Sequence, residues 1–167
     1  DVVVDAVLAK RNLGTHLTDA SCVVGVGPGF LPGRDCHAAV ETQRGHDLGR
    51  VLWDRAPASN TGVPGEIGGY TVERLLRAPA DGVFLPAARI GDLVEAGQPV
   101  GYVEGTPMRA LISGVLRGLL PDGTPVHTGM KAGDIDPRCR REHCFSVSDK
   151  ARAVGGGVLE AILTQYH

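Results

Sequence analysis

Apolar residues along the chain gather in short, valine-rich runs that glycine and proline interrupt. The runs at 2–8 (VVVDAVL) and 22–26 (CVVGV) have the length and the continuous apolar character of buried strands. A third strand is predicted at 49–53 (GRVLW), and residues 35–43 are predicted to form a short helix with Asp35 near its N-cap. This order of elements predicts a short-strand α/β segment, the end of a Rossmann-like unit.

The middle of the chain contains an internal repeat. Residues 77–101 and 109–133 align without a gap at an offset of 32 residues, with eight identities in 25 positions. The identical pairs are Arg77/Arg109, Ala78/Ala110, Gly82/Gly114, Val83/Val115, Gly91/Gly123, Val94/Val126, Gly97/Gly129 and Gly101/Gly133. Two copies of a glycine-punctuated strand pair predict a pseudo-two-fold sandwich, in which each half covers the apolar face of the other.

The repeat resembles the biotinyl/lipoyl-type barrel-sandwich hybrid in the stretches APADGVF and IGDLVEAGQPVGYVEG. In carrier domains of that type, the hairpin between the halves presents a modified lysine. The hairpin here, 104–110 (EGTPMRA), contains Met108 and Arg109 but no lysine. The resemblance therefore implies a barrel-sandwich-hybrid-like β domain that serves as a scaffold and has no swinging arm.

The C-terminal stretch 146–166 is predicted to be helical, with Ser146 or Ser148 as its N-cap. Three glycines, 155–157, lie inside it, and each costs a helix about 1 kcal/mol relative to alanine. Either the helix breaks and restarts at these glycines, or a neighbour packs against the bare backbone. The whole pattern predicts a mixed α+β protein in three parts: the α/β segment 1–69, the repeat-built β domain 70–137, and a helical segment 138–167 that packs back on the first part.

The amino-acid composition disfavours several classes of binding partner. Aromatic residues make up only 4% of the 167 residues, which disfavours a base-stacking nucleic-acid surface, and the formal net charge of −2 favours no polyanionic partner. No apolar run reaches the roughly 18 residues of a membrane span, and no signal peptide is evident. The four cysteines are irregularly spaced, unlike a secreted disulfide framework. These features predict a cytoplasmic protein that binds neither nucleic acid nor membranes; self-association into a homo-oligomer is left open.

The stretch 27–46 (GPGFLPGRDCHAAVETQRGH) holds the first candidate chemistry. A glycine turn after a strand can direct backbone N–H groups at an anion. Open α/β sheets bind ligands at the edge where the carboxyl ends of their strands lie. The alternative is a plain tight turn between two elements. The residues predicted to bind an anionic cofactor are Lys10, Arg11, Asn12, Gly27, Gly29, Phe30, Arg34, Arg44, Gly155 and Gly156.

The same stretch offers a candidate metal site. His37 and Glu41 are four residues apart and would share one face of the predicted helix, so with Asp35 or His46 they could hold a divalent metal of open identity. His37 or His46 could instead act as a general acid or base near neutral pH, and we assign that catalytic role to His46. The alternative is a surface histidine that is hydrogen-bonded to a nearby carboxylate.

Cys144 is the candidate nucleophile. It precedes the C-terminal helix, and Arg140, Arg141 and Lys150 nearby predict a lowered thiol pKa. Such a thiol could carry sulfur or selenium; the alternative is a buried structural cysteine. Zinc is disfavoured, because Cys139 and Cys144 flank a single histidine and lack the paired spacing of a structural zinc site.

Five stretches together resemble the YqeB family: VVVDAVLAKRN, GVGPGFLPGRDCHAAVETQRGHDLGRV, NTGVPGEIGGY, RAPADGVF and CFSVSDKARAVGGGVLEAIL. These are bacterial proteins of the selenium-dependent molybdenum hydroxylase system, and the chain resembles their C-terminal portion, without an upstream Rossmann-like segment. The resemblance implies an accessory role in maturing such a hydroxylase, with molybdopterin or a nucleotide as the bound cofactor. The implied partners are the hydroxylase itself or other cofactor-maturation proteins.

Three hypotheses follow. The first is an accessory protein that binds an anionic pterin or nucleotide cofactor. The second is an enzyme, either a chalcogen transferase or a metal-assisted hydrolase, that uses Cys144 or the group His37, Glu41 and His46. The third is an interaction module that docks on the hydroxylase. The sequence favours the first and leaves open whether the protein is an enzyme.

Overall fold

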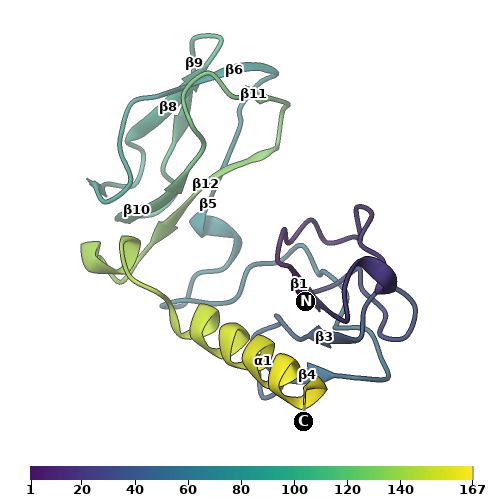
Figure 1. Cartoon of the computed structure of the whole chain (residues 1–167). Helices are drawn as coiled ribbons and strands as arrows, with labels where there is room; N and C mark the ends of the chain where they lie inside the picture. The colour runs from purple at the N-terminus through teal and green to yellow at the C-terminus, as the bar shows by residue number, and fades with distance from the viewer. Residues whose placement is uncertain (167) are drawn as a thin grey trace. The chain divides into compact units, whose positions relative to one another are not determined.

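The computed structural model describes residues 1–166 and divides into two compact units. Unit 1 combines Asp1–Gly62 with the C-terminal segment that begins at Val147, and unit 2 is Val63–Ser146. The chain therefore leaves unit 1, forms unit 2 and returns. The predicted α+β class is confirmed, since three sheets and one α-helix are present in this part of the chain (Figure 1).

Unit 1 is built on one four-stranded sheet. Its strands follow in the order β1 (Val2–Asp5), β2 (Cys22–Val26), β3 (Ala38–Val40) and β4 (Val51–Leu52), with the 3-10 turn η1 (Leu17–Asp19) before β2. The first three strands are parallel and β4 is antiparallel to β3. The apolar runs at 2–8 and 22–26 thus contain strands, as predicted.

The predicted helix at 35–43 is wrong. Ala38–Val40 form the parallel strand β3, and all three residues are buried. The backbone N–H of His37 donates to Val23 O at 2.8 Å, so pairing with β2 decides the conformation. Asp35 is not a helix cap: its carboxylate accepts from Leu31 N and closes a turn. Tertiary pairing has overridden a weak local preference here.

The helix α1 (Asp149–Gln165) covers one face of this sheet. Ser148, one of the two predicted caps, accepts a hydrogen bond from Ala151 N at 3.1 Å. The helix packs on β2, β3 and β4 through Val154, Val158, Ala161 and Ile162. The opposite face of the sheet is covered by a cluster that contains Phe30 and Cys36.

The helix runs without a break through its three glycines, so the second explanation for them holds. At Gly157 the helix backbone lies directly against the carbonyl of Gly49 and the side chain of Val40, which leaves no room for a Cβ. Gly155 and Gly156 have no such neighbour within 4 Å. One glycine of the three is therefore required by close packing.

Unit 2 contains two four-stranded antiparallel sheets, neither of which closes into a barrel in the described chain. The first has the order β5-β12-β10-β7 and the second β11-β6-β8-β9. The elements are η2 (Val72–Arg74), β5 (Leu75–Arg77), β6 (Gly82–Pro86), β7 (Leu93–Val94), β8 (Pro99–Val103), β9 (Thr106–Arg109), β10 (Gly114–Leu119), β11 (Pro125–Val126), β12 (Lys131–Asp136) and η3 (Arg141–Cys144).

The strand pairing repeats at the offset of the sequence repeat. The pair Gly82↔Val126 has its counterpart in Gly114↔Val94, and the irregularity in β12 after Lys131 has its counterpart in β8 after Pro99. Side chains follow the same rule: Arg77 donates to Gly129 O and Arg109 to Gly97 O, both at 2.9 Å. Each half of the repeat therefore supplies strands to both sheets.

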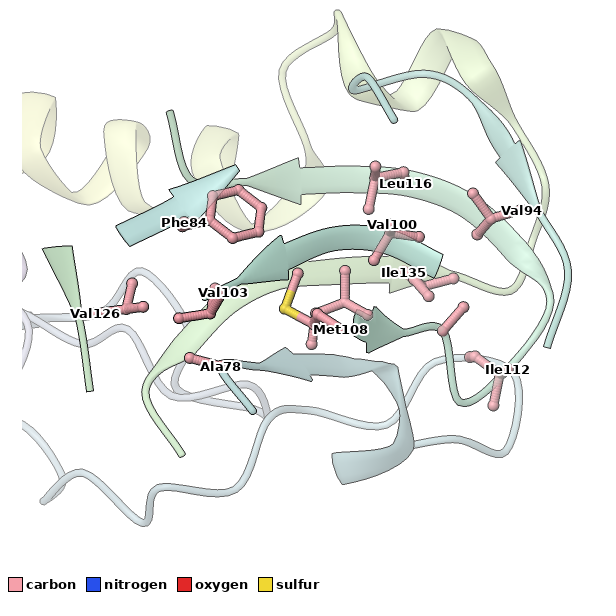
Figure 2. Packing of buried hydrophobic residues seen from close by; sticks show 13 residues of the cluster. Ala78, Phe84, Val94, Val100, Val103, Met108, Ile112, Leu116, Val126 and Ile135 are labelled. Atoms are coloured by element: carbon pink, nitrogen blue, oxygen red, sulfur yellow. The ribbon is translucent and has the colours of Figure 1, made fainter. Parts of the chain in front are cut away.

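Both copies of the repeat fill one core, shown in Figure 2. Twelve of its thirteen buried residues fall into pairs separated by the repeat offset. The pairs are Leu76/Met108, Ala78/Ala110, Phe84/Leu116, Val94/Val126, Val100/Ala132 and Val103/Ile135. Since these residues pack into one cluster, neither half can bury its apolar positions alone.

The glycine triplet provides a matched test of helix packing. Gly157→Ala should destabilise unit 1 by about 2 kcal/mol, because the added methyl group overlaps the backbone of Gly49. Gly156→Ala should stabilise it by up to about 1 kcal/mol through helix propensity. Urea unfolding followed by circular dichroism measures both. Equal effects of the two substitutions would contradict the packing described here.

Candidate functional site

The carboxyl ends of β1, β2 and β3 meet at one edge of the unit 1 sheet, because these strands are parallel. The segments that follow them, 6–15, 27–36 and 41–50, therefore begin at the same edge. Ligands of open α/β sheets bind outside these strand ends. The predicted Gly27–Gly29 turn lies here, directly after β2.

Close contacts fix the loop after β1 against the glycine turn. A Cβ on Gly29 would be 2.5 Å from Arg11 Cα, and one on Gly27 would be 3.0 Å from Thr42 Oγ1. Both glycines have positive φ, +84° at Gly27 and +111° at Gly29, a conformation that favours glycine. The structure thus brings Lys10 and Arg11 beside this turn, as the sequence predicted.

Glu41 is a structural anchor at this edge. Its buried carboxylate accepts hydrogen bonds from the backbone N–H groups of Thr42, Gln43 and Ala58, each at 2.7 Å. These bonds shape the turn after β3 and attach the segment near residue 58 to it. The carboxylate is therefore already satisfied by the protein.

Arg44 joins the turn after β3 to the first turn of α1. Its guanidinium donates to both carboxylate oxygens of Asp149, at 2.8 and 3.1 Å. Lys150 follows Asp149 and is half-buried. Burial lowers the pKa of Lys150, and the positive charges of Lys10 and Arg44 lower it further, while Glu41 opposes them.

We call Lys10, Arg44 and Lys150 the cation cluster. Two of its members were predicted; Lys150 was considered only as a neighbour of Cys144. The sequence signal for Lys150 was weak, since a single lysine after the N-cap of a helix is unremarkable. It is nevertheless informative, because the positive end of the helix dipole disfavours a cation there.

The remaining predicted cofactor-binding residues have other partners. Phe30 is buried in the core against Gly25, and Arg34 forms an ion pair with Asp35 at 2.8 Å. Asn12 accepts from Gly14 N and Thr15 N within its own loop. Gly155 and Gly156 lie inside the continuous α1, so the alternative in which the helix restarts there and caps an anion is wrong.

The helix that would have aligned His37 and Glu41 is absent, since β3 lies between them. His37 Nδ1 accepts from Val23 N at 3.0 Å, which places this histidine in the sheet's hydrogen-bond network. His46 is exposed in the turn before β4. Within residues 1–166, no group of three or more His, Cys, Asp or Glu side chains could hold a metal ion. A metal at Asp35, His37 and Glu41 stays a prediction.

Unit 2 has its own charged cluster around Asp136, which is fully buried. Arg138 donates to both of its oxygens, at 2.9 and 2.6 Å, and Arg117 lies at 3.3 Å. Hydrogen bonds from Arg138 lower the pKa of Asp136 to about 2, although burial opposes them. The repeat counterpart of Asp136 is Glu104, which accepts instead from Val83 N. The charged cluster around Asp136 therefore has no counterpart in the other half of the repeat.

The expected activation of Cys144 is wrong in direction. Burial raises the pKa of Cys144, and the opposing effects of Arg117 and Arg141 do not overcome it. Its Sγ lies 3.7 Å from Leu116 O, against β10. Cys139, by contrast, is exposed.

No family model matches the chain. It is 50% identical over 165 residues to "Uncharacterized protein YqeB" of Escherichia coli (strain K12), which aligns with 99% of this chain. Nearly the whole chain is therefore similar to one part of that protein. The chain spans only 30% of the length of that relative.

Among solved structures, an aspartoacylase family protein from Mesorhizobium loti is similar over 41% of this chain and 24% of its own, with 22% identity and a TM-score of 0.36. A likeness at this level supports no argument about fold or function. Within residues 1–166, no helix combines the length and apolar character needed to cross a membrane.

The pKa of Asp136 predicts how unit 2 responds to acid. A lowered carboxylate pKa contributes stability that is present above the ordinary pKa of about 4 and is lost as the pH falls toward 2. We expect a loss of about 2 kcal/mol across this range. In Asp136→Asn this dependence should disappear, and loss of the charged hydrogen bonds from Arg138 and Arg117 should destabilise unit 2 by about 2 kcal/mol at neutral pH.

Hydrogen exchange of the β10 and β12 amides, measured from pH 5 to pH 2.5 and corrected for intrinsic rates, tests this expectation. Asp122→Asn, at an exposed aspartate of the same unit, is the control. If Asp136→Asn and Asp122→Asn lose the same amount of stability, a structural role for Asp136 is contradicted.

The raised pKa of Cys144 predicts slow alkylation. At pH 7.5, iodoacetamide should modify exposed Cys139 about tenfold faster than Cys144, because only the thiolate reacts. Peptide mass spectrometry over time measures both rates in one sample. Faster modification of Cys144 would restore the activated-thiol hypothesis.

Proposed function

We propose that the chain is an accessory protein in the maturation of a selenium-dependent molybdenum hydroxylase, and that unit 1 binds an anionic pterin or nucleotide cofactor. The similarity to YqeB and the role implied by that family supply the biological context. One observation supports the binding site: the cation cluster lies beside a glycine turn at the carboxyl ends of parallel strands.

The charge of this edge favours an anion. Lys10 and Arg44 surround Lys150 with positive charge, and the acids beside them, Glu41 and Asp149, are already hydrogen-bonded to protein groups. Turns of this type and helix N-termini add N–H groups that bind phosphates. A molybdopterin carries a phosphate, often extended to a nucleotide, so its chemistry suits this edge.

Unit 2 fits the role of a scaffold or docking module. Its repeated pairing agrees with a barrel-sandwich-hybrid-like fold, and unit 1 with the end of a Rossmann-like unit. The hairpin between the halves cannot present a carrier lysine, because it has none; Met108 is in the core and Arg109 is bonded to Gly97 O. Docking of this unit on the hydroxylase is compatible with cofactor binding by unit 1.

The enzyme hypothesis has less support. A chalcogen transferase would need a reactive thiol, and burial raises the pKa of Cys144 instead. His46 is exposed, and its side chain has no hydrogen bond or ion pair with a carboxylate within residues 1–166.

Calorimetric titration of the chain with nucleoside 5′-monophosphates, nucleoside diphosphates and a phosphorylated pterin tests the proposal. We expect one of these to bind, and Arg44→Gln to weaken binding at least tenfold, since it removes a charge of the cluster and its link to α1. Arg89→Gln, at an exposed arginine of unit 2, should leave the affinity unchanged.

Absence of binding by every ligand of this set would overturn the cofactor role. The maturation role has a separate test in a bacterium that encodes the full-length protein. Deleting its gene should lower the activity of the molybdenum hydroxylase but not its amount, and undiminished activity would overturn this role.

A further inference from the structure

The two lysines of the cation cluster have charges that the protein leaves uncompensated. Lys10 lies in the loop after β1 and Lys150 in the first turn of α1, so folding brings them together from opposite ends of the chain. Neither ammonium group has a hydrogen-bond or ion-pair partner among residues 1–166. The nearby acids offer none, because Glu41 is bonded to three backbone N–H groups and Asp149 to Arg44.

This arrangement is unfavourable without a ligand. Half-burial and the neighbouring positive charges both lower the pKa of Lys150, which means that its charged form is destabilised in the fold. Lys131 in β12, by contrast, is exposed. Groups perturbed in this way by burial and by like charges are enriched at functional sites.

The backbone holds Lys10 in place. Lys10 and Leu8 both have left-handed φ, +65° and +60°, which is uncommon for residues other than glycine. The loop is kept in this form by its contacts with the glycine turn, through Arg11 at Gly29 and Leu8 at Gly27. Lys10 is thus positioned by packing at the turn that would supply N–H groups to an anion.

We propose that Lys10 and Lys150 together hold a phosphoryl dianion at this edge, with Lys150 as a binding residue of the site; this inference rests on the proposed function of unit 1. Two ammonium groups match a phosphate monoester or pyrophosphate, which carries close to two negative charges per terminal group at neutral pH. A carboxylate or a phosphodiester would compensate only one. Lysine binds phosphate as a point charge and needs no planar partner.

Because a bound phosphate compensates the charge of Lys150, ligand binding is coupled to protonation of this lysine. Bound phosphate favours the ammonium form of Lys150, so binding takes up a proton at pH values where the free site is partly neutral. The other charged groups that face Lys150 are Lys10, Arg44 and Glu41. Comparison of the Lys150 variant with the Lys10 variant assigns the proton uptake to one of the two lysines.

Calorimetry with inorganic pyrophosphate, GMP, cyclic GMP and guanosine tests the inference. Pyrophosphate and GMP should bind, and cyclic GMP should bind at least tenfold more weakly than GMP, since its phosphodiester has a single charge. Lys150→Met and Lys10→Met should each weaken GMP binding at least tenfold. Lys150→Arg should restore most of it, and Lys131→Met is the matched control that should change nothing.

Measurements at pH 7 to 9.5 in two buffers of different ionisation enthalpy should show proton uptake in the wild type and less in Lys150→Met. Thermal unfolding of each variant verifies that it is folded. GMP binding that persists unchanged in both lysine variants overturns this inference and leaves the proposed function intact.

Lysine-dependent binding of pyrophosphate without any binding of nucleotide or pterin supports the phosphoryl site and overturns the cofactor role. No binding of any of these ligands overturns both.

Discussion

The packing of α1 on the sheet of unit 1 is the constraint on which the candidate site depends. The helix begins more than 100 residues after β2 and β3, which it covers, and the whole of unit 2 lies between them in sequence. Its approach is close because Gly157 presents bare backbone to Gly49, and its first turn is held by the Arg44–Asp149 pair. Without that approach, Lys150 would not lie near Lys10 and Arg44.

A second constraint governs unit 2. Its two sheets share one core to which both copies of the repeat contribute the same positions. This explains several of the identities between the copies: Arg77 and Arg109 bond to glycine carbonyls of the other half, and the pairs Ala78/Ala110 and Val94/Val126 are buried. The Asp136 cluster departs from this pattern. A buried carboxylate between two arginines stabilises the fold only while all members are present.

Much of the fold was predictable, because it is encoded locally or by repetition. The strand Cys22–Val26 is a continuous apolar run, Ser148 is a local cap, and the repeat offset sets the strand pairing of unit 2. The helix at 35–43 was mispredicted, since its short polar-apolar pattern is also compatible with a buried strand and only pairing with β2 decides between them.

The site was predictable in part for the same reason. Glycines after a strand indicate the edge of the candidate site, and Lys10, Arg11 and Arg44 follow strands that form this edge. The sequence does not reveal the position of Lys150 beside Lys10 and Arg44, because it depends on contacts between distant segments. The same holds for Glu41, whose carboxylate is already used in hydrogen bonds. The thiol pKa of Cys144 was mispredicted because neighbouring arginines are visible in the sequence, whereas burial is not.

Chemical-shift mapping tests the central claim, that the edge of unit 1 binds a phosphorylated ligand, most directly. In a titration of the ¹⁵N-labelled chain with GMP, we predict saturable shifts of the amides of Lys10, Gly27, Gly29 and Lys150, with unit 2 unaffected. Shifts confined to unit 2, or none at millimolar GMP, would contradict it.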